Sequence, residues 1–564
     1  MRRVLLIGAT GAFGSRLAAL LATFTNIELV LAARGLTALT QLRNDLVNQY
    51  PAARITVQQF DRSRADSIAS ISPWLVIDTA GPFQDTDYGL AQTAIGCGAH
   101  YIDIADARRF VANFAEALDA QARTAGVLAV TGASSTPALS HAVLAPLVTG
   151  WRRLDDVIVA ICPGAKAPRG LSVIQAILSY VGRPVRVFSN GHWISSPGWS
   201  GARRLAIPGL GRRWTSLCET PDLDMLPAHF PIQRTALFLA GVEPGLMHLG
   251  LTALSLPVRW GLISSLKRLA RPLRFVAGLL DRFGSDRGGM LVQASGADHK
   301  GRNVVARWSL LARDNAGPSV PIAAAAAMVR GLLDNRITQT GAQACVGLLK
   351  PEAILCELQH LPVMTREDEA WPDHATLFRR LLGRHVDDLP QAVRSVHDQE
   401  RAGTFAGTAI ARTGRGWPAR LLRWLVGLPK SGRYPVVVKM TADKTGESWA
   451  RQFGESSFRS RLQSTSQIAT FEEQFGPLRF TFDLARTERG VDWRFLGWSF
   501  LALPLPAWAA PKIRATATEA NSRYRFNVAV QHPALGLLFA YRGTLFVEQE
   551  SAPQSHTAYE ATCG

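Results

Sequence analysis

The opening third of the chain alternates short apolar runs with longer stretches in which apolar positions recur at helical spacing. Residues 4–7 form a continuous apolar run, typical of a parallel strand covered on both faces. A glycine-rich turn and an apolar helical pattern that ends near Phe24 follow directly. Five further strands are predicted at residues 28–32, 54–59, 74–78, 101–104 and 127–130. Strands that alternate with helices predict an α/β fold, a doubly wound parallel sheet over residues 1–147.

The pattern changes twice beyond this sheet. Residues 148–364 mix strands at 156–161 and 302–311 with helices, one of them at 322–333, and predict an α+β domain. An acidic, proline-containing stretch at residues 366–373 predicts a linker, which we place at 365–376. Short alternating segments then predict a mostly antiparallel β domain at 377–550, a curved sheet or an incomplete barrel. A tail of residues 551–564 completes the chain.

Charge and composition narrow the choice of partners. The formal net charge of +18 calls for an acidic partner to be considered, but no zinc-finger, RNA-recognition or homeodomain pattern is present, so nucleic acid is not expected. Within residues 251–283, apolar helical segments carry Arg259, Lys267, Arg268, Arg271 and Arg274. This combination suits an anionic membrane surface, and equally a solvated basic face of an insertion at the substrate cleft. No apolar run reaches the length that spans a bilayer.

The cysteines point to the compartment. Six are scattered without a CxxC or any metal-like spacing, so we expect reduced thiols in a cytoplasmic protein and no metal site. If residues 251–283 bind lipid, the protein is expected to be peripheral on the inner membrane face.

The turn after the first strand has the spacing of a dinucleotide-binding loop. Gly8 permits a tight turn, Gly11 lets the backbone approach a pyrophosphate, and Gly14 lets helix and strand pack closely. Thr10, Ala12 and Phe13 complete the turn, and the helix that follows offers N–H groups and a positive dipole end to phosphates. Strand, turn and helix occur together, which is the context that gives the motif its meaning.

The end of the second strand indicates which dinucleotide binds. An NAD-specific site carries an acid there to accept hydrogen bonds from the ribose 2′-hydroxyl, and this chain has Arg34 instead. A guanidinium favours a 2′-phosphate, so we predict NADP(H) as the cofactor. Asp61 ends the third strand at the same sheet edge, where ligands of such folds bind.

Four segments resemble the NADP-binding domain of the saccharopine dehydrogenase-like family of oxidoreductases: GATGAFG, AARGLTAL, VIDTAGPFQDTDYGLAQTAIGCGAHYIDIAD and TGASSTPALS. The resemblance covers residues 2–147, and a glycine-proline turn with a returning helix extends it to about residue 350. It implies that Ala80, Gly81, Pro82 and Phe83 pass over the cofactor and that residues 101–103 lie near the nicotinamide. It also implies that residues 148–364 bind substrate and dimerise, which makes a homodimer one of the expected assemblies. Where many relatives have glycine-glutamate, this chain has Ala105 and Asp106, which puts the local backbone there in question.

The last part of the chain resembles domain of unknown function 4166. The segments LPQAVRSVH, ESWARQFG, FRSRL, FEEQFGPLRF, LGWSFLALPLP and AYRGTLF carry this resemblance over residues 378–546, and it transfers no chemistry. Five residues are candidates for lining a ligand cavity or, alternatively, for packing the interior of the sheet: His397, Trp449, Arg451, Glu473 and Tyr541.

Hydride transfer is the chemistry of the cofactor, so the protein must orient the nicotinamide and handle one proton. Tyr101 and Asp103 share a face of their strand because they are two residues apart, and we predict them as catalytic; the alternative is that they brace the domain. Ser134 is expected to bond to the carboxamide or the pyrophosphate of the cofactor. No Tyr-x-x-x-Lys occurs anywhere in the chain, which argues against a short-chain dehydrogenase.

Three functions follow from these observations. The first is an NADP-dependent oxidoreductase that transfers hydride to or from a small or lipid-like carbonyl, imine or enoyl substrate. The second is a non-catalytic NADP-sensing, ligand-binding protein at a membrane surface. The third is an NADP-dependent synthase that forms an imine between two amines, which would need acidic groups in the cleft.

Overall fold

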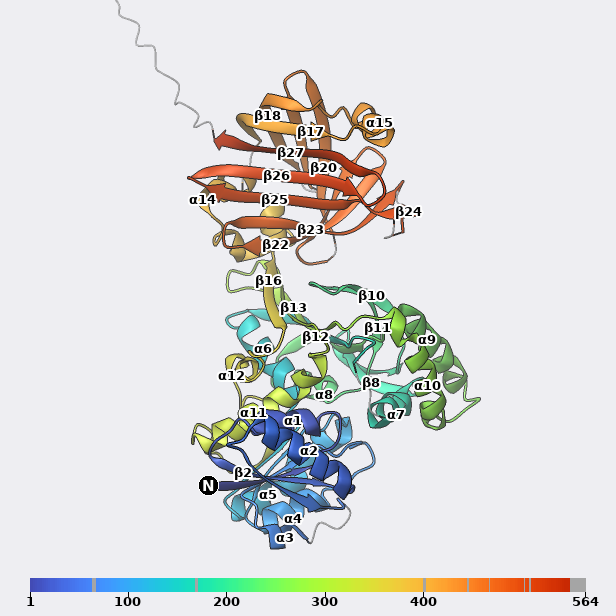
Figure 1. Cartoon of the computed structure of the whole chain (residues 1–564), viewed down its shortest axis with the longest axis vertical. Helices are drawn as coiled ribbons and strands as arrows, with labels where there is room; N and C mark the ends of the chain where they lie inside the picture. Colours follow the sequence, from blue (N-terminus) through green and yellow to red (C-terminus); the bar gives the residue numbers. More distant parts are fainter. Residues whose placement is uncertain are drawn as a thin grey trace, which may run out of the picture. The chain divides into compact units, whose positions relative to one another are not determined.

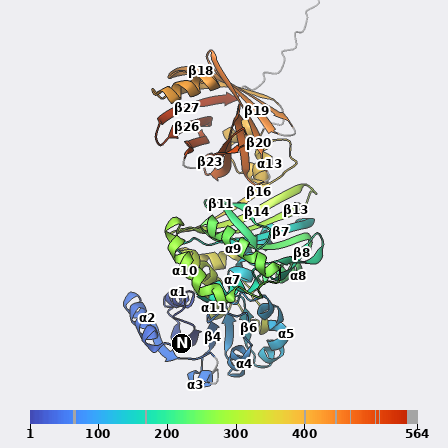
Figure 2. The ribbon, with the colours of Figure 1, turned by 90° about the vertical axis from the view of Figure 1, so that its right-hand side faces the viewer.

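A computed structural model describes residues 1–62, 67–167, 171–398, 402–443, 446–465, 467–501, 503–506 and 509–547. The chain forms two compact units. Unit 1 comprises Met1–Arg302 and Ala306–Glu367, and unit 2 comprises Asn303–Val305 and Asp368–Gly564. Figures 1 and 2 show the elements of each unit from two directions. The predicted tail at 551–564 lies outside the described residues.

Unit 1 begins with a seven-stranded sheet in the order β15-β6-β5-β4-β1-β2-β3, and its neighbouring strands run parallel. The strands are β1 (Arg2–Ile7), β2 (Ile27–Ala33), β3 (Arg54–Gln59), β4 (Leu75–Asp78), β5 (His100–Asp103), β6 (Leu128–Thr131) and β15 (Gly341–Ala344). Its helical segments are α1 (Gly14–Leu21), α2 (Leu36–Gln49), α3 (Ile68–Ile71), α4 (Gly89–Gly96), α5 (Arg108–Thr124), η2 (Ser135–Leu139) and α6 (Ser140–Leu147). The predicted doubly wound parallel sheet is therefore confirmed.

The chain order reverses between β1 and β4. From β1 it passes to β2 on one side, and later strands are added on the other side from β4 onward. Such a switch leaves a crevice at the carboxyl ends of the strands, where ligands of this fold bind. Val4, Leu5 and Leu6 of β1 are fully buried, as the apolar run predicts.

Strand β15 belongs to the first sheet although its residues lie outside the domain predicted to end at residue 147. It pairs with β6. In the chain it follows η5 (Gly317–Ser319) and α11 (Val320–Leu333) and precedes α12 (Pro351–Cys356). Helix α11 packs against α1. A four-residue strand with a short apolar pattern is too weak a signal for sequence reasoning, and only its pairing with β6 reveals where it belongs.

The second sheet of unit 1 is mixed, in the order β10-β11-β12-β7-β13-β14-β16, with β8 and β9 beside β12. Its strands are β7 (Arg153–Cys162), β8 (Pro184–Ser189), β9 (His192–Pro197), β10 (Arg203–Ile207), β11 (Gly211–Leu217), β12 (Ile232–Ala240), β13 (Gly288–Ala297), β14 (Asn303–Ala312) and β16 (Val363–Ala370). Its helical segments are α7 (Leu171–Tyr180), α8 (Asp222–His229), α9 (Gly245–Arg259), η3 (Lys267–Leu269), α10 (Ala270–Leu280) and η4 (Asp281–Phe283). The predicted α+β class and the helical segments at 251–283 are present.

The predicted linker at 365–376 is wrong over its first half, because β16 forms an edge strand beside β14 there. Acidic residues made the stretch look solvated, yet Asp368 and Glu369 are buried. Glu369 accepts a hydrogen bond of 2.9 Å from Trp371 Nε1 and pairs with Arg384. These two partners lower the cost of burying the Glu369 carboxylate, and the acidic composition of the stretch does not reveal them.

Unit 2 is a closed antiparallel barrel rather than the incomplete one considered above. Ten strands form a ring because β22 pairs with β23, and β24 lies beside β23 outside the ring. The strands are β17 (Gly403–Thr413), β18 (Gly432–Asp443), β19 (Gly446–Phe453), β20 (Ser456–Ser464), β21 (Thr470–Phe475), β22 (Leu478–Thr487), β23 (Gly490–Phe500), β24 (Leu503–Pro504), β25 (Lys512–Ala520), β26 (Arg523–His532) and β27 (Gly536–Val547). The helical segments of this unit are α13 (Leu377–Leu382), η6 (Gly383–Val386), α14 (Gln391–His397) and α15 (Trp417–Val426). Its aromatic and aliphatic core is separate from that of unit 1.

Candidate active site

Unit 1 contains a cavity of about 1630 Å³ at the carboxyl ends of the strands of the parallel sheet. Twelve of the thirteen predicted cofactor residues line it: Gly8, Thr10, Gly11, Ala12, Phe13, Arg34, Asp61, Ala80, Gly81, Pro82, Phe83 and Ser134. They come from the loops that follow β1, β2, β3, β4 and β6, which the parallel topology brings to one edge. The switch point of the sheet is therefore lined by the predicted residues.

Gly14, the thirteenth, lies behind the turn instead of in the cavity wall. A Cβ at this position would come within 2.1 Å of the carbonyl oxygen of Gly8. Gly8 itself has φ +80°, and a Cβ there would lie 2.9 Å from the backbone nitrogen of Ala80. Both positions exclude a side chain, so the first strand, the turn and α1 can approach one another closely.

The start of α1 suits an anion. The helix has no side-chain cap and no acidic residue in its first turn, which leaves its N-terminal dipole uncompensated. Arg34, at the end of β2, has an exposed side chain in the cavity wall. The backbone carbonyl of Arg34 accepts a hydrogen bond of 3.0 Å from Gln59 Nε2, so the loop is held while the guanidinium stays available. A pyrophosphate and a 2′-phosphate could thus be bound at separate points.

Beneath the loop after β4, an ion pair between a buried aspartate and a partly buried arginine holds the backbone in place. Asp78 is fully buried, and Arg62 approaches its Oδ2 atom at 2.7 Å. Burial raises the pKa of Asp78, and the charge of Arg62 opposes that shift. Asp78 Oδ1 accepts a hydrogen bond of 2.9 Å from the backbone nitrogen of Ala80, and Arg62 lies over the ring of Phe83. The pair therefore positions the Ala-Gly-Pro-Phe loop that covers the cavity edge.

Tyr101 and Asp103, the predicted catalytic pair, do not line the cavity. Tyr101 is 1% exposed, stacks on Phe114, and donates a long hydrogen bond of 3.5 Å to Asp78. Asp103 Oδ1 accepts hydrogen bonds from Thr131 Oγ1 (2.8 Å) and from the backbone nitrogens of Ala105 and Gly132 (both 2.9 Å). The geometry therefore favours the alternative that both residues brace the strand ends. Their shared strand face points into the core, which sequence alternation could not reveal.

Three aspartates lie in the cavity wall, Asp61, Asp106 and Asp286, and Asp106 is three residues beyond Asp103. The backbone turns after β5 and brings this side chain into the lining, next to Gln84 from the loop after β4. Gln84 Nε2 donates a hydrogen bond of 3.3 Å to Asp106 Oδ1. The Asp106 side chain is exposed to the cavity, and desolvation by the surrounding walls raises the pKa of its carboxyl. From the sequence, Asp106 is one of several possible proton donors in the loops at this sheet edge, and it stands where many related sequences have glutamate.

A tyrosine and a cysteine from the mixed sheet region approach this acid. The hydroxyl of Tyr180 lies 2.8 Å from Cys218 Sγ, and Cys218 lines the cavity. Burial raises the pKa of Cys218 to about 12, and the charge of Asp106 adds to that shift. Burial likewise raises the pKa of Tyr180 well above its usual value. Both groups therefore remain protonated at neutral pH, and no signal in the local sequence pointed to either.

The far part of the cavity is apolar. Its walls come from β7, β13, α7, α9 and α10, and the leucine, isoleucine, valine and alanine residues of these elements dominate the lining. Trp199 closes one side and is fully buried. Helix α9 is held to β11 by His248, whose Nε2 atom lies 2.9 Å from Ser216 Oγ, and burial lowers the pKa of this histidine to about 4. The helical spacing of apolar residues at 251–283 was the only sequence signal for this wall.

Unit 2 contains a smaller cavity, of about 140 Å³, inside the barrel. Four of the five residues predicted there, Trp449, Arg451, Glu473 and Tyr541, line it. Arg451 pairs with Glu473 at 3.1 Å and lies over the ring of Trp449. The fifth, His397, is not part of the lining and contacts the hydroxyl of Tyr524 at 2.9 Å.

Two negative findings concern only the described part of the chain. No group of three or more histidine, cysteine, aspartate or glutamate side chains is arranged to hold a metal ion there. No helix within those residues is both long enough and apolar enough to cross a membrane.

Comparison with known proteins gave matches at both ends of the chain. Residues 4–130 match the family model of the saccharopine dehydrogenase NADP-binding domain, and residues 389–545 match that of DUF4166, a domain of unknown function. No curated protein matches the sequence.

Solved structures that resemble the chain do so distantly. Saccharopine dehydrogenase (L-Glu forming) from Saccharomyces cerevisiae is 12% identical with a TM-score of 0.48, over 65% of this chain and 100% of that one. The diaminopimelate (DAP) dehydrogenase of C. glutamicum is 14% identical with a TM-score of 0.34, over 63% and 98% of the two chains. A mutant meso-DAP dehydrogenase of Clostridium tetani is 12% identical with a TM-score of 0.33, over 61% and 94%.

The family match at residues 4–130 coincides with the cavity loops that offer a dipole, an arginine and a close backbone approach to a phosphorylated dinucleotide. NADP(H) is therefore the cofactor. By its first domain the chain is similar to the saccharopine dehydrogenases and is an NADP-dependent oxidoreductase, and by its last domain it is similar to the DUF4166 proteins.

Proposed function

We propose that the protein transfers hydride between NADP(H) and a lipid-like substrate that carries a carbonyl, imine or enoyl group. One observation carries the proposal: the cofactor loops and the apolar helices of the mixed sheet region line the same continuous cavity. A substrate whose reactive group lies near the nicotinamide would extend its remaining atoms along α9 and α10.

The size and the lining of the cavity favour an apolar substrate. Ligand pockets commonly measure about 300–1,000 Å³, whereas this cavity has about 1630 Å³. It therefore has room for a second large ligand beside a dinucleotide. An aliphatic chain gains roughly 0.8 kcal/mol for each methylene it buries, so an apolar wall of this extent selects for chain length.

NADPH supplies hydride when bound, and the chain must supply the rest. The raised pKa of Asp106 keeps its carboxyl protonated to higher pH, so this residue can hold the proton that a reduced carbonyl, imine or enoyl group takes up. Gln84 orients the carboxyl through their hydrogen bond. Apolar side chains around the remainder of the cavity exclude water from the reacting groups.

The substrate class is tested by NADPH oxidation with homologous ketones and enoyl thioesters of increasing chain length. We expect kcat/KM to rise by about threefold to fourfold per methylene until the cavity is filled. Ala277→Leu narrows the cavity from α10 and should abolish the gain for the longer substrates alone. Gly278→Ala, next along α10, faces open space and serves as the matched control. Tight NADPH binding without turnover for any substrate would favour the NADP-sensing alternative instead.

The role of Asp106 is tested separately. Asp106→Asn should lower turnover in the reducing direction by about 100-fold to 10,000-fold, as expected for loss of a general acid. In the unmodified protein this rate should fall as pH rises through the raised pKa, since the deprotonated carboxylate has no proton to give. Asp45→Asn, on the exposed face of α2, is the control. A pH profile that keeps its alkaline limb in Asp106→Asn would exclude Asp106 as the proton donor.

A further inference from the structure

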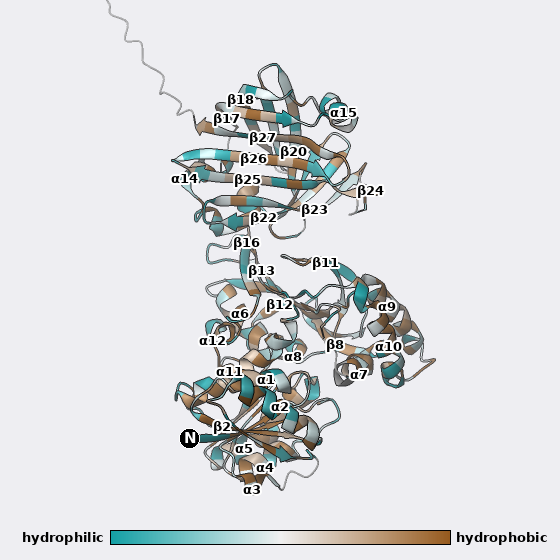
Figure 3. Cartoon of the chain, viewed as in Figure 1, coloured by the Kyte–Doolittle hydropathy of each residue, from teal (hydrophilic) through white to brown (hydrophobic). Residues whose placement is uncertain are grey.

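The segment from α9 to η4, residues 245–283, presents an unusual surface for a water-facing part of a protein. Ten large apolar side chains of this segment are exposed: Leu246, Leu249, Trp260, Leu262, Ile263, Leu269, Phe275, Val276, Leu279 and Phe283. Trp260, Leu262 and Phe275 each expose at least 70% of their surface. Figure 3 shows the hydrophobic colouring of α9 and α10. Exposed apolar groups concentrated in one segment indicate an interaction site.

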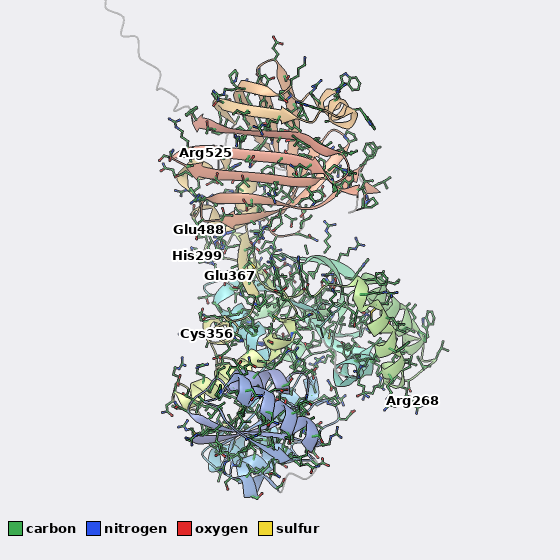
Figure 4. The ribbon with its side chains drawn as sticks, viewed as in Figure 1. Arg268, His299, Cys356, Glu367, Glu488 and Arg525 are labelled. Atoms are coloured by element: carbon green, nitrogen blue, oxygen red, sulfur yellow. The ribbon has the colours of Figure 1, made fainter. Side chains whose placement is uncertain are left out.

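Basic side chains are interspersed among these apolar ones. Arg259, Arg268, Arg271, Arg274 and Arg282 are exposed, and none of them forms a salt bridge with another described residue. Asp281 is the only acid between residues 245 and 283. Figure 4 shows Arg268 at the outer edge of the segment. Charge of one sign combined with exposed tryptophan, phenylalanine and leucine matches a surface that is anionic outside and apolar beneath, which is the chemistry of a lipid bilayer.

The same two helices also form the wall of the cavity. Met247, Leu251 and Leu254 of α9, and Leu273, Ala277 and Leu280 of α10, line it. Leu246 and Val276 are both exposed and part of the lining, which puts an opening of the cavity at this segment. Helices α7 and α10 pack together, and Figures 1 and 2 show α7, α9 and α10 close to one another in the mixed sheet region.

We propose that residues 245–283 bind an anionic lipid bilayer and that a lipid-like substrate passes from it between α9 and α10 into the cavity. The passage of substrate rests on the proposed function, whereas the docking itself is measured without any substrate. Arginine side chains contact the lipid headgroups, and Trp260, Leu262 and Phe275 enter the acyl region beneath them. No helix needs to cross the bilayer for this mode of binding.

Docking is tested by co-sedimentation of the full-length protein with vesicles. We expect binding to vesicles of equal parts phosphatidylcholine and phosphatidylglycerol, at least tenfold weaker binding to phosphatidylcholine alone, and weaker binding as salt is raised. Arg268→Glu/Arg271→Glu/Arg274→Glu should weaken binding to the anionic vesicles at least tenfold. Trp260→Ser/Phe275→Ser should do the same with the charge unchanged. NADPH binding, which must remain at its original affinity, shows that the variants are folded.

Matched variants in the barrel test whether vesicle binding depends on residues 245–283 or only on the overall positive charge of the protein. Arg459→Glu/Arg489→Glu/Arg525→Glu removes the same charge from exposed positions of unit 2 and should leave vesicle binding within about twofold. Helix α15 also exposes two aromatic side chains, Trp417 and Trp424. If Trp417→Ser/Trp424→Ser abolishes vesicle binding while the 245–283 variants retain it, the proposal is overturned.

Two further outcomes would also overturn it. Retention of vesicle binding by both 245–283 variants would remove the segment as the docking surface. A change from dimer to monomer in Trp260→Ser/Phe275→Ser, measured by sedimentation without vesicles, together with unchanged vesicle binding, would identify a second copy of the chain as the occupant. Failure of the chain-length test would instead reject the substrate class and leave these binding measurements intact.

Discussion

At the scale of single residues, we expect Arg34 to select NADP(H) over NAD(H). Its guanidinium is exposed in the cavity wall and makes no competing ion pair among the described residues. Removing a charge-assisted contact to a phosphate costs roughly 1.5–3 kcal/mol, or about 10-fold to 100-fold in affinity. Arg34→Ala should therefore weaken NADPH binding by that factor and leave NADH binding unchanged.

Titration calorimetry with both cofactors measures this difference. Arg54→Ala, an exposed arginine at the start of β3 outside the cavity wall, should bind NADPH as the unmodified protein does. Equal losses for NADPH and NADH in Arg34→Ala would show that the residue acts on the loop and not on the 2′-phosphate.

The burial of Asp103 leads to a prediction about the stability of the protein. Burial raises its pKa from 3.8 to about 7, against hydrogen bonds that favour the charged form. A raised pKa means that the folded protein favours the protonated acid. Asp103 therefore makes its whole contribution to stability below about pH 4, and this contribution is lost as the pH rises through about 7. The loss amounts to about 4 kcal/mol at most. Relative to Asp103→Asn, which does not titrate, the unmodified protein should lose stability over this interval.

Urea unfolding of both proteins at several pH values between about 4 and 8 measures the difference. Turnover is the second measurement. A bracing residue changes the stability without removing a proton donor from the cavity, so Asp103→Asn should alter the free energy of unfolding and leave the catalytic proton donor in place. A stability difference that does not vary with pH would contradict the raised pKa of Asp103.

At the scale of elements, the turn between β1 and α1 depends on the absence of a side chain at Gly14. A Cβ would lie 2.1 Å from the carbonyl oxygen of Gly8, and backbone cannot yield as the end of a flexible side chain can. Gly14→Ala should displace α1 from β1, lower unit 1 stability by roughly 1–3 kcal/mol, and weaken NADPH binding more than tenfold.

Gly96→Ala provides the comparison for this variant. Its added methyl would meet only the end of the Gln121 side chain, at 3.8 Å, in a helix outside the cavity wall. Thermal unfolding and NADPH titration of both variants measure the effect. Normal NADPH affinity in Gly14→Ala would show that the turn adapts, and the close approach of β1 and α1 would not be required.

At the scale of the whole molecule, the two units have separate hydrophobic cores and should unfold in two transitions. NADPH at about 100 times its Kd should stabilise unit 1 by about 2.7 kcal/mol and raise only one transition. Arg451→Met leaves Glu473 buried without its cation inside the barrel, which costs roughly 3–5 kcal/mol. It should lower the other transition by about 10 °C.

Differential scanning calorimetry with and without NADPH measures both effects. Arg459→Met, an exposed arginine on β20, is the matched control. A single transition that responds to both NADPH and Arg451→Met would show that the two units unfold together.

The sequence alone determined the local features. Apolar runs of four to six residues, the glycine turn and the arginine after β2 predicted the parallel sheet, the cofactor loop and NADP(H), because each depends on residues close together in the chain. Alternating short segments likewise predicted a β domain at the end of the chain.

Contacts between distant residues decided the rest. Closure of the barrel depends on pairing of β22 with β23, and completion of the first sheet depends on β15 returning to β6. Tyr101 and Asp103 share a strand face as predicted, but packing against Phe114 and Thr131 turns that face into the core, and the next turn brings Asp106 into the cavity. Alternation along a strand says which side chains lie together; only the packing of the whole domain says whether they face core or ligand.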